Sequence, residues 1–497
     1  MIRRDPESAA GAQHDLVVVG GGIYGAFVAL EAARSGYRPL LLERSDFGGR
    51  TTWNNLRIVH GGLRYLQMFD LRRFRESVRE RRWFLAHFAD LVHPLPCLMP
   101  LYGRGLRRPT VLRLALLLND VLSFDRNRGM GEDRKVPPGS VLNTRDTIRL
   151  FPEVKREGLR GGARWSDGEM SSPQRVLMET LHWACATGAI CLNYVEASDL
   201  LVHDGSVIGV RAVDRSTGRS FEFSAPVVVN SAGPWSRIVA RDFDRDVPDL
   251  FRPTVAFNLL LDRPPLAEVT VAVAASHGDG TYFLRPWGDR IFAGTYHTMA
   301  SPRAALELGT ETPEPSREEI ERFLSELMHA VPALEVGLDD VVRVYAGFVP
   351  STRSGKLARG EVLYDHGSAG GPKGLFSLAG AKFTTARLGA ERLLSLAYGA
   401  GRKMPRAPSG EGRPPPTPEL NTQEFGDLLE HDPAAAAAYV RRIAEEESIL
   451  HVEDLLLRRT DWGADPRQMA ALSPLVGPLI DSHLPSSSGP QRSYDAP

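Results

Sequence analysis

The chain has 497 residues, of which 42% are hydrophobic and 24% are charged. This length excludes a single small module, and this composition is that of a folded globular protein rather than a disordered chain. With 60 basic and 61 acidic residues the net charge is −1, so the chain has no overall attraction to polyanions and we predict no nucleic-acid partner.

The cysteine content and the N-terminus indicate the compartment. Cys97, Cys185 and Cys191 are too few and too irregularly spaced for a disulfide framework or a metal site, so we interpret them as packing residues and expect no metal. Residues 1–12 lack the apolar stretch of a secretory signal and predict a loose tail. These features favour a cytoplasmic protein.

The longest apolar run spans residues 111–124. It is interrupted by Arg113, Asn119 and Asp120 and is shorter than the roughly 20 residues that a membrane-spanning helix needs. Because arginines flank it from residue 104 onward, the run predicts an amphipathic helix. Such a helix either lies on the inner face of a membrane or packs on the core with a basic solvated edge, and we favour the second interpretation.

The chain begins with a predicted βαβ unit and continues as an α/β body. The apolar strand Leu16–Val19 is followed by a glycine turn, a helix that ends near Gly36, and a second strand, Pro39–Leu42. Further predicted elements are strands at 206–213 and 227–229, a helix at 171–187, strands at 255–261, 269–274, 282–285 and 291–293, and a helix near 317–330. The strands between 250 and 350 indicate an inserted antiparallel sheet.

The predicted fold class is α/β, with a Rossmann-like dinucleotide-binding domain, an inserted antiparallel-sheet substrate domain and a small helical C-terminal domain. We place the first domain at 14–250 and 340–402, and the substrate domain at 251–339 with contributions from about 85–165. The proline-rich segment 403–418 predicts a linker, residues 419–484 predict the helical domain, and the chain after 485 is predicted to be disordered.

A glycine-rich turn directly follows the first strand. Residues 20–25 fit the pattern G-x-G-x-x-G, and Glu43 closes the next strand 18 residues after Gly25. Glycine suits the tight turn at Gly20, backbone approach to a pyrophosphate at Gly22, and close helix–strand packing at Gly25. A carboxylate at Glu43 can accept hydrogen bonds from ribose hydroxyls. The motif does not distinguish NAD from FAD, although its position near the N-terminus favours a flavin.

The segment 56–66, LRIVHGGLRYL, resembles the flavin-proximal segment of the FAD-dependent glycerol-3-phosphate dehydrogenases. Further landmarks follow in family order at 167–170, 229–235, 286–287, 294–295 and 380–387, and segment 453–460 resembles the arginine-pair motif of the family's C-terminal domain. The resemblance covers about residues 14–465. It implies a D-amino-acid-oxidase-like flavoprotein that holds FAD noncovalently and passes electrons to a quinone or to oxygen.

The glycine motif and the resemblance together give the expected cofactor contacts. They are Gly20, Gly22, Ile23, Gly25, Glu43, Arg44, His60, Gly61, Gly62, Ala232, Gly233, Trp235, Gly380, Lys382, Phe383 and Thr384. Gly61 and Gly62 would let the backbone approach the isoalloxazine ring, with a plain glycine turn as the alternative. Positive charge or N–H dipoles are needed near one edge of that ring to hold its anionic reduced form.

Lysine usage gives an independent indication. Only six of the 60 basic residues are lysines, and the rest are arginines. A lysine kept in a glycine- and threonine-rich turn, at Lys382, indicates a compact ammonium that acts on a substrate oxygen or on the flavin. The family has its active-site lysine at this position. Arg64 and Tyr65 match family residues that line the substrate cavity, and with His60 we expect them to orient the substrate.

The expected substrate end departs from the family pattern. Val349 takes the place of a substrate arginine, which leaves a phosphate unpaired unless Arg353 or Arg359 reaches it. Arg359 is expected to match a second substrate arginine. Asn258 replaces a histidine, and an amide is no general base. His297 replaces the usual aspartate and is either a relocated base or a core histidine.

These departures predict retained flavin chemistry with an altered small-molecule substrate. Loss of one buried charged contact costs about 2–5 kcal/mol, which weakens glycerol-3-phosphate binding by roughly tens to thousands of fold. We therefore predict an FAD-dependent oxidoreductase that transfers hydride from a hydroxyl-bearing carbon to flavin N5. An amine or amino-acid oxidase on the same fold and a flavin-binding protein without catalysis are the alternatives, and a homodimer is compatible with the sequence.

Overall fold

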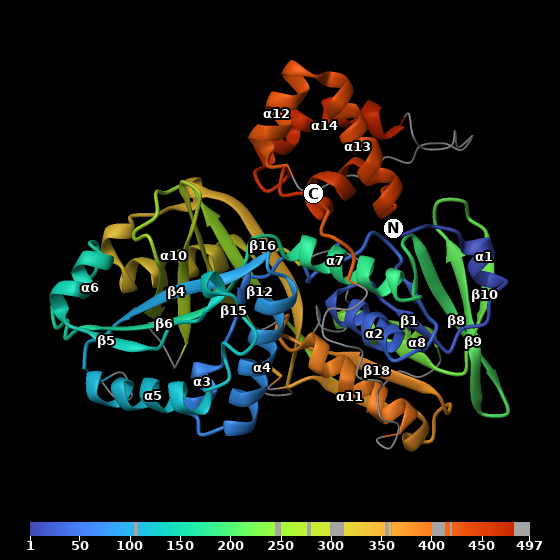
Figure 1. Cartoon of the computed structure of the whole chain (residues 1–497), viewed down its shortest axis with the longest axis horizontal. Helices are drawn as coiled ribbons and strands as arrows, with labels where there is room; N and C mark the ends of the chain where they lie inside the picture. Colours follow the sequence, from blue (N-terminus) through green and yellow to red (C-terminus); the bar gives the residue numbers. More distant parts are fainter. Residues whose placement is uncertain are drawn as a thin grey trace.

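The computed structural model describes residues 1–103, 108–243, 250–275, 280–298, 313–352, 357–358, 360–399, 413–417 and 420–481. Figure 1 shows two sheet-containing lobes side by side, with the helical C-terminal domain above the place where they meet. The mixed α/β architecture with a helical C-terminal region agrees with the predicted fold class.

The first lobe is built on a six-stranded sheet with β1 (Leu16–Val19) in its interior. The strand order is β17 (Val362–Asp365), β18 (Leu375–Ala379), β11 (Val228–Asn230), β1, β2 (Pro39–Leu42) and β7 (Ile190–Leu192). The pairs β1–β2, β1–β11, β2–β7 and β11–β18 are parallel, and β17 is antiparallel to β18. All four β1 residues are buried, as expected for a strand that is covered on both faces.

Side-chain alternation along β1 explains the two layers that cover this sheet. Leu16 and Val18 share a hydrophobic cluster with helices α2 (Ile23–Arg34), α7 (Pro173–Ala186) and α11 (Ala386–Tyr398). Val17 and Val19 pack in another cluster with the three-stranded sheet of β8 (Val195–His203), β9 (Ser206–Asp214) and β10 (Ser220–Ser224). The apolar run of β1 therefore fixes a three-layered lobe.

The second lobe contains a nine-stranded, mainly antiparallel sheet. Its order is β16 (Val341–Ser351), β12 (Arg252–Leu261), β15 (Arg290–Thr298), β14 (Thr281–Trp287), β13 (Thr270–Ala274), β4 (Val92–Pro100), β6 (Gly162–Met170) and β3 (Ile58–Val59), with β5 (Ser140–Leu142) paired to β6. The β13–β4 pair is parallel. The edge strand β16 comes from residues that the predicted boundary at 340 assigned to the first domain, because it pairs with β12 along its whole length.

Helix α10 (Arg317–Ala330) packs on the second sheet, and the other helical elements belong to both lobes. Helix α10 matches its predicted bounds and packs Phe323 and Leu327 on β12. The remaining helical elements are α1 (Pro6–Ala10), α3 (Leu63–Gln67), α4 (Leu71–His87), α5 (Pro109–Leu122), α6 (Thr144–Leu150), α8 (Ser236–Asp242), and the short turns Glu132–Arg134, Gly233–Trp235, Pro332–Leu334, Leu338–Asp340 and Gly367–Ala369.

The C-terminal domain packs its own small core and sits on α7. It consists of α12 (Thr422–His431), α13 (Pro433–Glu447), a π-helical turn Asp454–Arg459 and α14 (Pro466–Asp481). Phe425 and Trp462 stack in its centre with ring centroids 3.9 Å apart. Arg175 of α7 binds Glu447 at 2.8 Å, so charged pairs join the domain to the first lobe. Most of the predicted linker lies outside the described residues.

One local prediction is wrong and another holds in part. The N-terminal segment is no loose tail, because Ile2 is buried and its N–H donates to the Glu446 carbonyl at 2.7 Å. Helix α5 packs Leu112 and Leu116 into the core of the second lobe, as favoured, but other apolar side chains of the helix face outward, among them Leu117 at 60% exposure. Within the described parts of the chain, no helix is long and apolar enough to cross a membrane.

Candidate active site

The glycine turn after β1 is dictated by close packing. Gly20 has φ 110°, and a Cβ there would lie 2.6 Å from the Ser231 carbonyl oxygen. A Cβ at Gly25 would lie 1.9 Å from the Gly20 carbonyl oxygen. Both positions therefore require glycine, which brings the start of α2 against the turn and against the end of β11.

The N-terminus of α2 is open to a ligand. Its N-cap is Gly22, which provides no side chain to cap the helix, and Ile23 N–H donates to Thr52 Oγ1 at 3.1 Å. Gly21 N–H donates to the Glu43 carboxylate at 2.7 Å, and the other Glu43 oxygen accepts from Ser45 N–H at 2.9 Å. A helix N-terminus that has no side-chain cap and stands beside a carboxylate suits a pyrophosphate followed by a ribose.

The segment after β11 lies across β1 from Glu43. The Asn230 side chain ties it down by donating to the Ser236 carbonyl at 2.7 Å. Gly233 has φ 58°, and a Cβ there would meet nothing within 4 Å, so this glycine faces open space. The Trp235 ring packs edge-on against Phe348, and the Arg44 guanidinium lies 5.9 Å from the same indole.

The flavin-proximal motif starts with His60, directly after β3. The side chain of His60 is half exposed, and its Nδ1 lies 3.1 Å from the carboxylate of Asp167 on β6. Gly61 N–H donates to the same carboxylate at 2.7 Å. A Cβ at Gly61 would lie 2.1 Å from Arg81 Nη1, and Gly62 has φ 87°. The backbone conformation requires glycine at Gly62, and a side chain at Gly61 would displace the Arg81 guanidinium. The contact of both glycines with the isoalloxazine stays a prediction.

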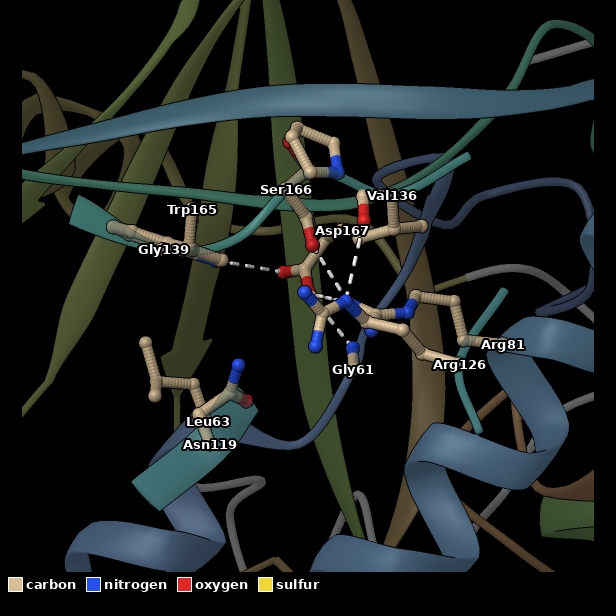
Figure 2. A pocket seen from close by; sticks show the side chains of 11 residues that line it. Gly61, Leu63, Arg81, Asn119, Arg126, Val136, Gly139, Trp165, Ser166 and Asp167 are labelled. Atoms are coloured by element: carbon tan, nitrogen blue, oxygen red, sulfur yellow. Dashed lines mark hydrogen bonds and ion pairs between the residues drawn. The ribbon is translucent and has the colours of Figure 1, made fainter. Parts of the chain in front are cut away.

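Figure 2 shows the surroundings of Asp167 beneath this motif. Arg81 of α4 donates to the Ser166 carbonyl at 2.6 Å and lies 3.6 Å from the Asp167 carboxylate. The indole N–H of Trp165 approaches the carboxylate at 3.4 Å. A small cavity of about 10 Å³, large enough for one water molecule, adjoins these residues.

The 380–385 turn is tied to the glycine turn by Tyr24. The Tyr24 hydroxyl donates to the Lys382 carbonyl at 3.0 Å, and a Cβ at Gly380 would lie 1.9 Å from that hydroxyl oxygen. Thr384 is buried, and the Phe383 ring lies 5.9 Å from Phe84. The first and last segments of the nucleotide-binding lobe thus meet, as the sequence predicted.

Lys382 and His297 both lie within the electrostatic influence of Arg64. The Lys382 ammonium lies 4.2 Å from the centre of the Tyr65 ring. Solvent reaches the side chains of Lys382 and His297, although protein atoms surround much of each. This burial, with Arg64 as a second cause, lowers the pKa of Lys382 to about 8 and that of His297 to about 4. Arg64, Tyr65, Lys382 and His297 are therefore neighbours.

The other predicted substrate residues lie in or near the sheet. Asn258 is 2% exposed, donates to the Asn54 carbonyl at 2.9 Å and accepts from the Thr295 hydroxyl at 2.8 Å. Val349 is 7% exposed on β16. Contact of Asn258 or Val349 with a substrate stays a prediction, and Arg353 and Arg359 lie outside the described residues.

Sequence reasoning assigned no role to Asp167, Arg81, Tyr24 or Thr52. Asp167 stands in a segment that matched the family, and Tyr24 occupies a variable position of the glycine motif. Their positions within motifs were a signal for both residues. Nothing in the sequence indicated that Asp167 would pair with His60, 107 residues away, or Tyr24 with Lys382, 358 residues away.

The residues present fit FAD. The glycine turn and the N-terminus of α2 suit its pyrophosphate, Glu43 suits its adenosine ribose, and Gly233 faces open space. Lys382 supplies positive charge beside the expected position of the ring. These features match the predicted cofactor at both ends.

Comparisons with known proteins agree with this geometry. The family described as FAD dependent oxidoreductase (DAO) matches residues 15–396. Glycerol-3-phosphate dehydrogenase 1 of Mycobacterium tuberculosis is 30% identical over 504 residues, covering 92% of this chain and 93% of that protein. Alpha-glycerophosphate oxidase of Streptococcus pyogenes serotype M1 is 31% identical over 342 residues, covering 68% and 54%.

Solved structures show the same fold. Glycerol-3-phosphate dehydrogenase from Bacillus halodurans, complexed with FAD, superposes with a TM-score of 0.70 at 22% identity, covering 96% of this chain and 92% of that one. L-alpha-glycerophosphate oxidase from Mycoplasma pneumoniae, with FAD bound, gives a TM-score of 0.58 at 15% identity, covering 82% and 100%. At these identities the likeness concerns the fold alone.

Proposed function

Because this chain belongs to the DAO family of FAD-dependent oxidoreductases, we propose that it oxidises a small anionic alcohol related to glycerol-3-phosphate. The FAD cofactor and the enzyme class, both predicted from the sequence, are confirmed by the family and its relatives. The observation that supports an anionic alcohol is the cluster of Arg64 and Lys382 around Tyr65 beside the FAD-binding turn.

Each residue of the cluster has a physical role in this proposal. When bound, FAD supplies an acceptor for the hydrogen and the two electrons that leave the substrate carbon. The Lys382 ammonium binds the substrate oxygen, and Tyr65 holds the ammonium in place beneath it. Arg64 attracts the anionic end of the substrate. With a pKa of about 4, His297 is neutral at pH 7 and is a weak base.

The substrate is proposed to differ from glycerol-3-phosphate at its anionic end. Val349 occupies the position of the family's substrate arginine. It lies on β16 opposite Thr254 of β12 and is nearly buried. A valine offers no hydrogen bond to a phosphate, so a smaller anion such as a carboxylate fits this end better. We retain oxidation of an alcohol over oxidation of an amine because the clustered cations repel an ammonium group.

Anaerobic reduction of the bound flavin tests this proposal. Glycerol-3-phosphate, hydroxy acids, uncharged polyols, amines and amino acids are added separately, and bleaching of the flavin absorbance is recorded. We expect reduction by an anionic alcohol and a slower reduction by its uncharged analogue. Reduction by amines or amino acids alone supports the amine-oxidase alternative, and reduction by none of the donors supports a flavin-binding protein without catalysis.

We also propose that the protein docks on an anionic lipid surface. The apolar patch, defined here as exposed side chains at the α3–α4 turn and along α5, lies along one edge of the molecule where α3 and α5 touch (Figure 1). It consists of Met68, Phe69, Leu71, Val111, Leu114, Leu117, Leu118, Val121 and Phe124. Phe69 and Phe124 are 88% and 82% exposed, which is unusual for a soluble surface.

Charge around the apolar patch favours lipid over a second copy of the chain. Arg108 and Arg113 are exposed, and no ion pair is recorded for either within the described part of the chain. The neighbouring carboxylate of Asp125, by contrast, is already paired with Arg75 and Arg82. A basic rim around apolar side chains matches an anionic headgroup layer over acyl chains. A docked enzyme would have access to a quinone as electron acceptor, with oxygen as the alternative.

Vesicle binding tests the docking proposal. We expect the protein to sediment with anionic phospholipid vesicles, and the variant Phe69→Ser/Val121→Ser to stay in solution. Val202→Ser is a matched control, because Val202 is 44% exposed on β8 in the other lobe. A doubled mass in solution that Phe69→Ser/Val121→Ser abolishes, without vesicle binding, would instead identify a homodimer interface.

A further inference from the structure

A buried carboxylate lies directly behind the exposed histidine of the flavin-proximal motif. Asp167 is 4% exposed, and its two oxygens face His60 Nδ1 at 3.1 Å and Gly61 N–H at 2.7 Å. Trp165 and Arg81 close the other sides of the carboxylate (Figure 2). The adjoining cavity has room for one water molecule, so bulk solvent does not compete for these hydrogen bonds.

The carboxylate is ionised at neutral pH. Burial raises the pKa of Asp167, but the hydrogen bond from His60, the charge of Arg81 and the Gly61 N–H oppose burial, and this pKa lies below its ordinary value. An ionised carboxylate only accepts hydrogen bonds. His60 Nδ1 must therefore carry the hydrogen, which leaves Nε2 as a lone-pair acceptor in the neutral ring.

The side of His60 away from Asp167 is exposed and lies beside strand β14. Its side chain is 50% exposed, and its ring lies 5.5 Å from Phe283 on β14. Phe283 pairs with Gly294 on β15, the strand that carries His297. No hydrogen bond to His60 Nε2 is recorded within the described residues.

We infer that Asp167 is a positioning residue that fixes His60 as the Nδ1–H tautomer and so makes Nε2 the acceptor of the substrate's hydroxyl proton. This inference rests on the proposed alcohol oxidation. The substrate O–H bond breaks and a bond from hydrogen to Nε2 forms, while the O–H electron pair becomes the second bond of the new carbonyl. The hydrogen on the substrate carbon leaves with its two electrons to the bound FAD.

Neither His297 nor Asn258, two other polar residues at the expected substrate end, serves this step as well as His60. His297 has its pKa lowered to about 4 by burial and by Arg64. Asn258 is an amide whose two polar groups are already used by Asn54 and Thr295. His60 is the histidine whose partner prepares it for proton transfer, in the same way that a carboxylate orients the base of a hydrolytic triad.

Histidine tautomers measured by ¹⁵N NMR test the inference without any turnover. In the oxidised FAD-bound enzyme without substrate, we expect a His60 signal with the proton on Nδ1, assigned by its loss in His60→Asn. In Asp167→Asn the new amide N–H can donate to Nδ1, so we expect the proton to move to Nε2. A His60 tautomer that is the same in both proteins would overturn the inference, whatever the substrate proves to be.

Kinetics separates positioning from a general structural role. General-base catalysis contributes roughly 10²–10⁴-fold, so we expect Asp167→Asn to lower kcat by about that factor while FAD binding and thermal stability are retained. Because Asp167 acts through His60, the double variant His60→Asn/Asp167→Asn should be no slower than His60→Asn alone. Multiplied losses in the double variant would contradict the inference.

Two further variants guard against misfolding as the cause. Asp167→Glu keeps the charge and is expected to recover part of the lost kcat and the Nδ1–H tautomer. Asp125→Asn is a matched control, because Asp125 pairs with Arg75 and Arg82 of α4 but has no contact with His60. A loss of kcat in Asp125→Asn equal to that in Asp167→Asn would assign the effect to α4 packing and overturn the inference.

Discussion

The guanidinium of Arg459, in the C-terminal domain, donates two hydrogen bonds of 2.6 and 2.8 Å to the carboxylate of Asp46, and both side chains are fully buried. Asp46 lies three residues after Glu43, which hydrogen-bonds the glycine turn. Arg458 also binds Asp46 at 2.9 Å. The arginine pair of the C-terminal domain therefore holds the loop that presents the expected ribose ligand.

Removal of Asp46 should loosen both the domain contact and cofactor binding. Asp46→Ala removes the shared carboxylate of two buried arginines and leaves Arg458 with Asp454 and Arg459 with Glu447 as acidic partners, and breaking a buried pair costs about 3–5 kcal/mol. We expect the free energy of unfolding in urea to fall by that amount and the affinity for FAD to fall with it. Glu222→Gln, which removes an exposed partner of Arg211, should leave both quantities unchanged. Equal FAD affinity in Asp46→Ala and wild type would separate the domain contact from the cofactor site.

Acid should weaken the same domain contact. Burial opposes ionisation of Glu447, but Arg175, His182 and Arg459 outweigh it and lower its pKa from 4.5 to about 2. Because the folded pKa is depressed, this stabilisation is fully present above pH 4.5 and is lost as the pH falls toward 2. Urea unfolding from pH 7 to 3 should show the stability gap between wild type and Glu447→Gln narrowing below pH 4.5. A gap that stays constant with pH contradicts the prediction.

Activity on an anionic substrate should fall as Lys382 loses its proton. Its pKa is lowered to about 8 by burial and by Arg64, so the ammonium is present below pH 8 and is lost above it. We expect kcat/KM to decline above pH 8. Lys382→Arg should shift that decline out of the measurable range, and Lys382→Met should lower kcat by about 10²–10³-fold and abolish the decline. An alkaline limb that persists in Lys382→Met belongs to another group.

The glycine turn should not accept a side chain at Gly25. A Cβ there would lie 1.9 Å from the Gly20 carbonyl oxygen, so Gly25→Ala must push α2 away from the turn. We expect the purified variant to lack the yellow colour of bound FAD. Gly337→Ala is the control, because its Cβ would meet nothing within 4 Å and its φ is −128°. Full FAD occupancy in Gly25→Ala would show that the turn adapts.

An arginine introduced at position 349 tests whether the substrate differs from glycerol-3-phosphate. Val349→Arg restores the residue type that the family has there, and a guanidinium donates two parallel hydrogen bonds to a phosphate. We expect KM for glycerol-3-phosphate to fall while KM for the preferred smaller anion rises. The thermal midpoint is recorded alongside, because Val349 is only 7% exposed. A folded variant with both KM values unchanged would place residue 349 outside the substrate pocket.

Much of the nucleotide-binding lobe could be predicted because its signals are local. The strand Leu16–Val19 is apolar at every position, which predicts a strand covered on both faces, and the glycines at 20 and 25 follow from backbone sterics within a few residues. In the second lobe, the helix near 317–330 is also predicted by its local pattern. Family motifs added Lys382 and the arginine pair.

The sequence by itself determined the cofactor class, the glycine turn and the lysine at position 382, because short-range backbone geometry and the spacing of a few motifs carry that information. Only the tertiary structure decided that α5 exposes part of its apolar face, that Ile2 is buried and that Asp167 stands behind His60. Burial and ion pairing depend on which distant part of the chain packs against a residue, and a local sequence pattern does not contain that information.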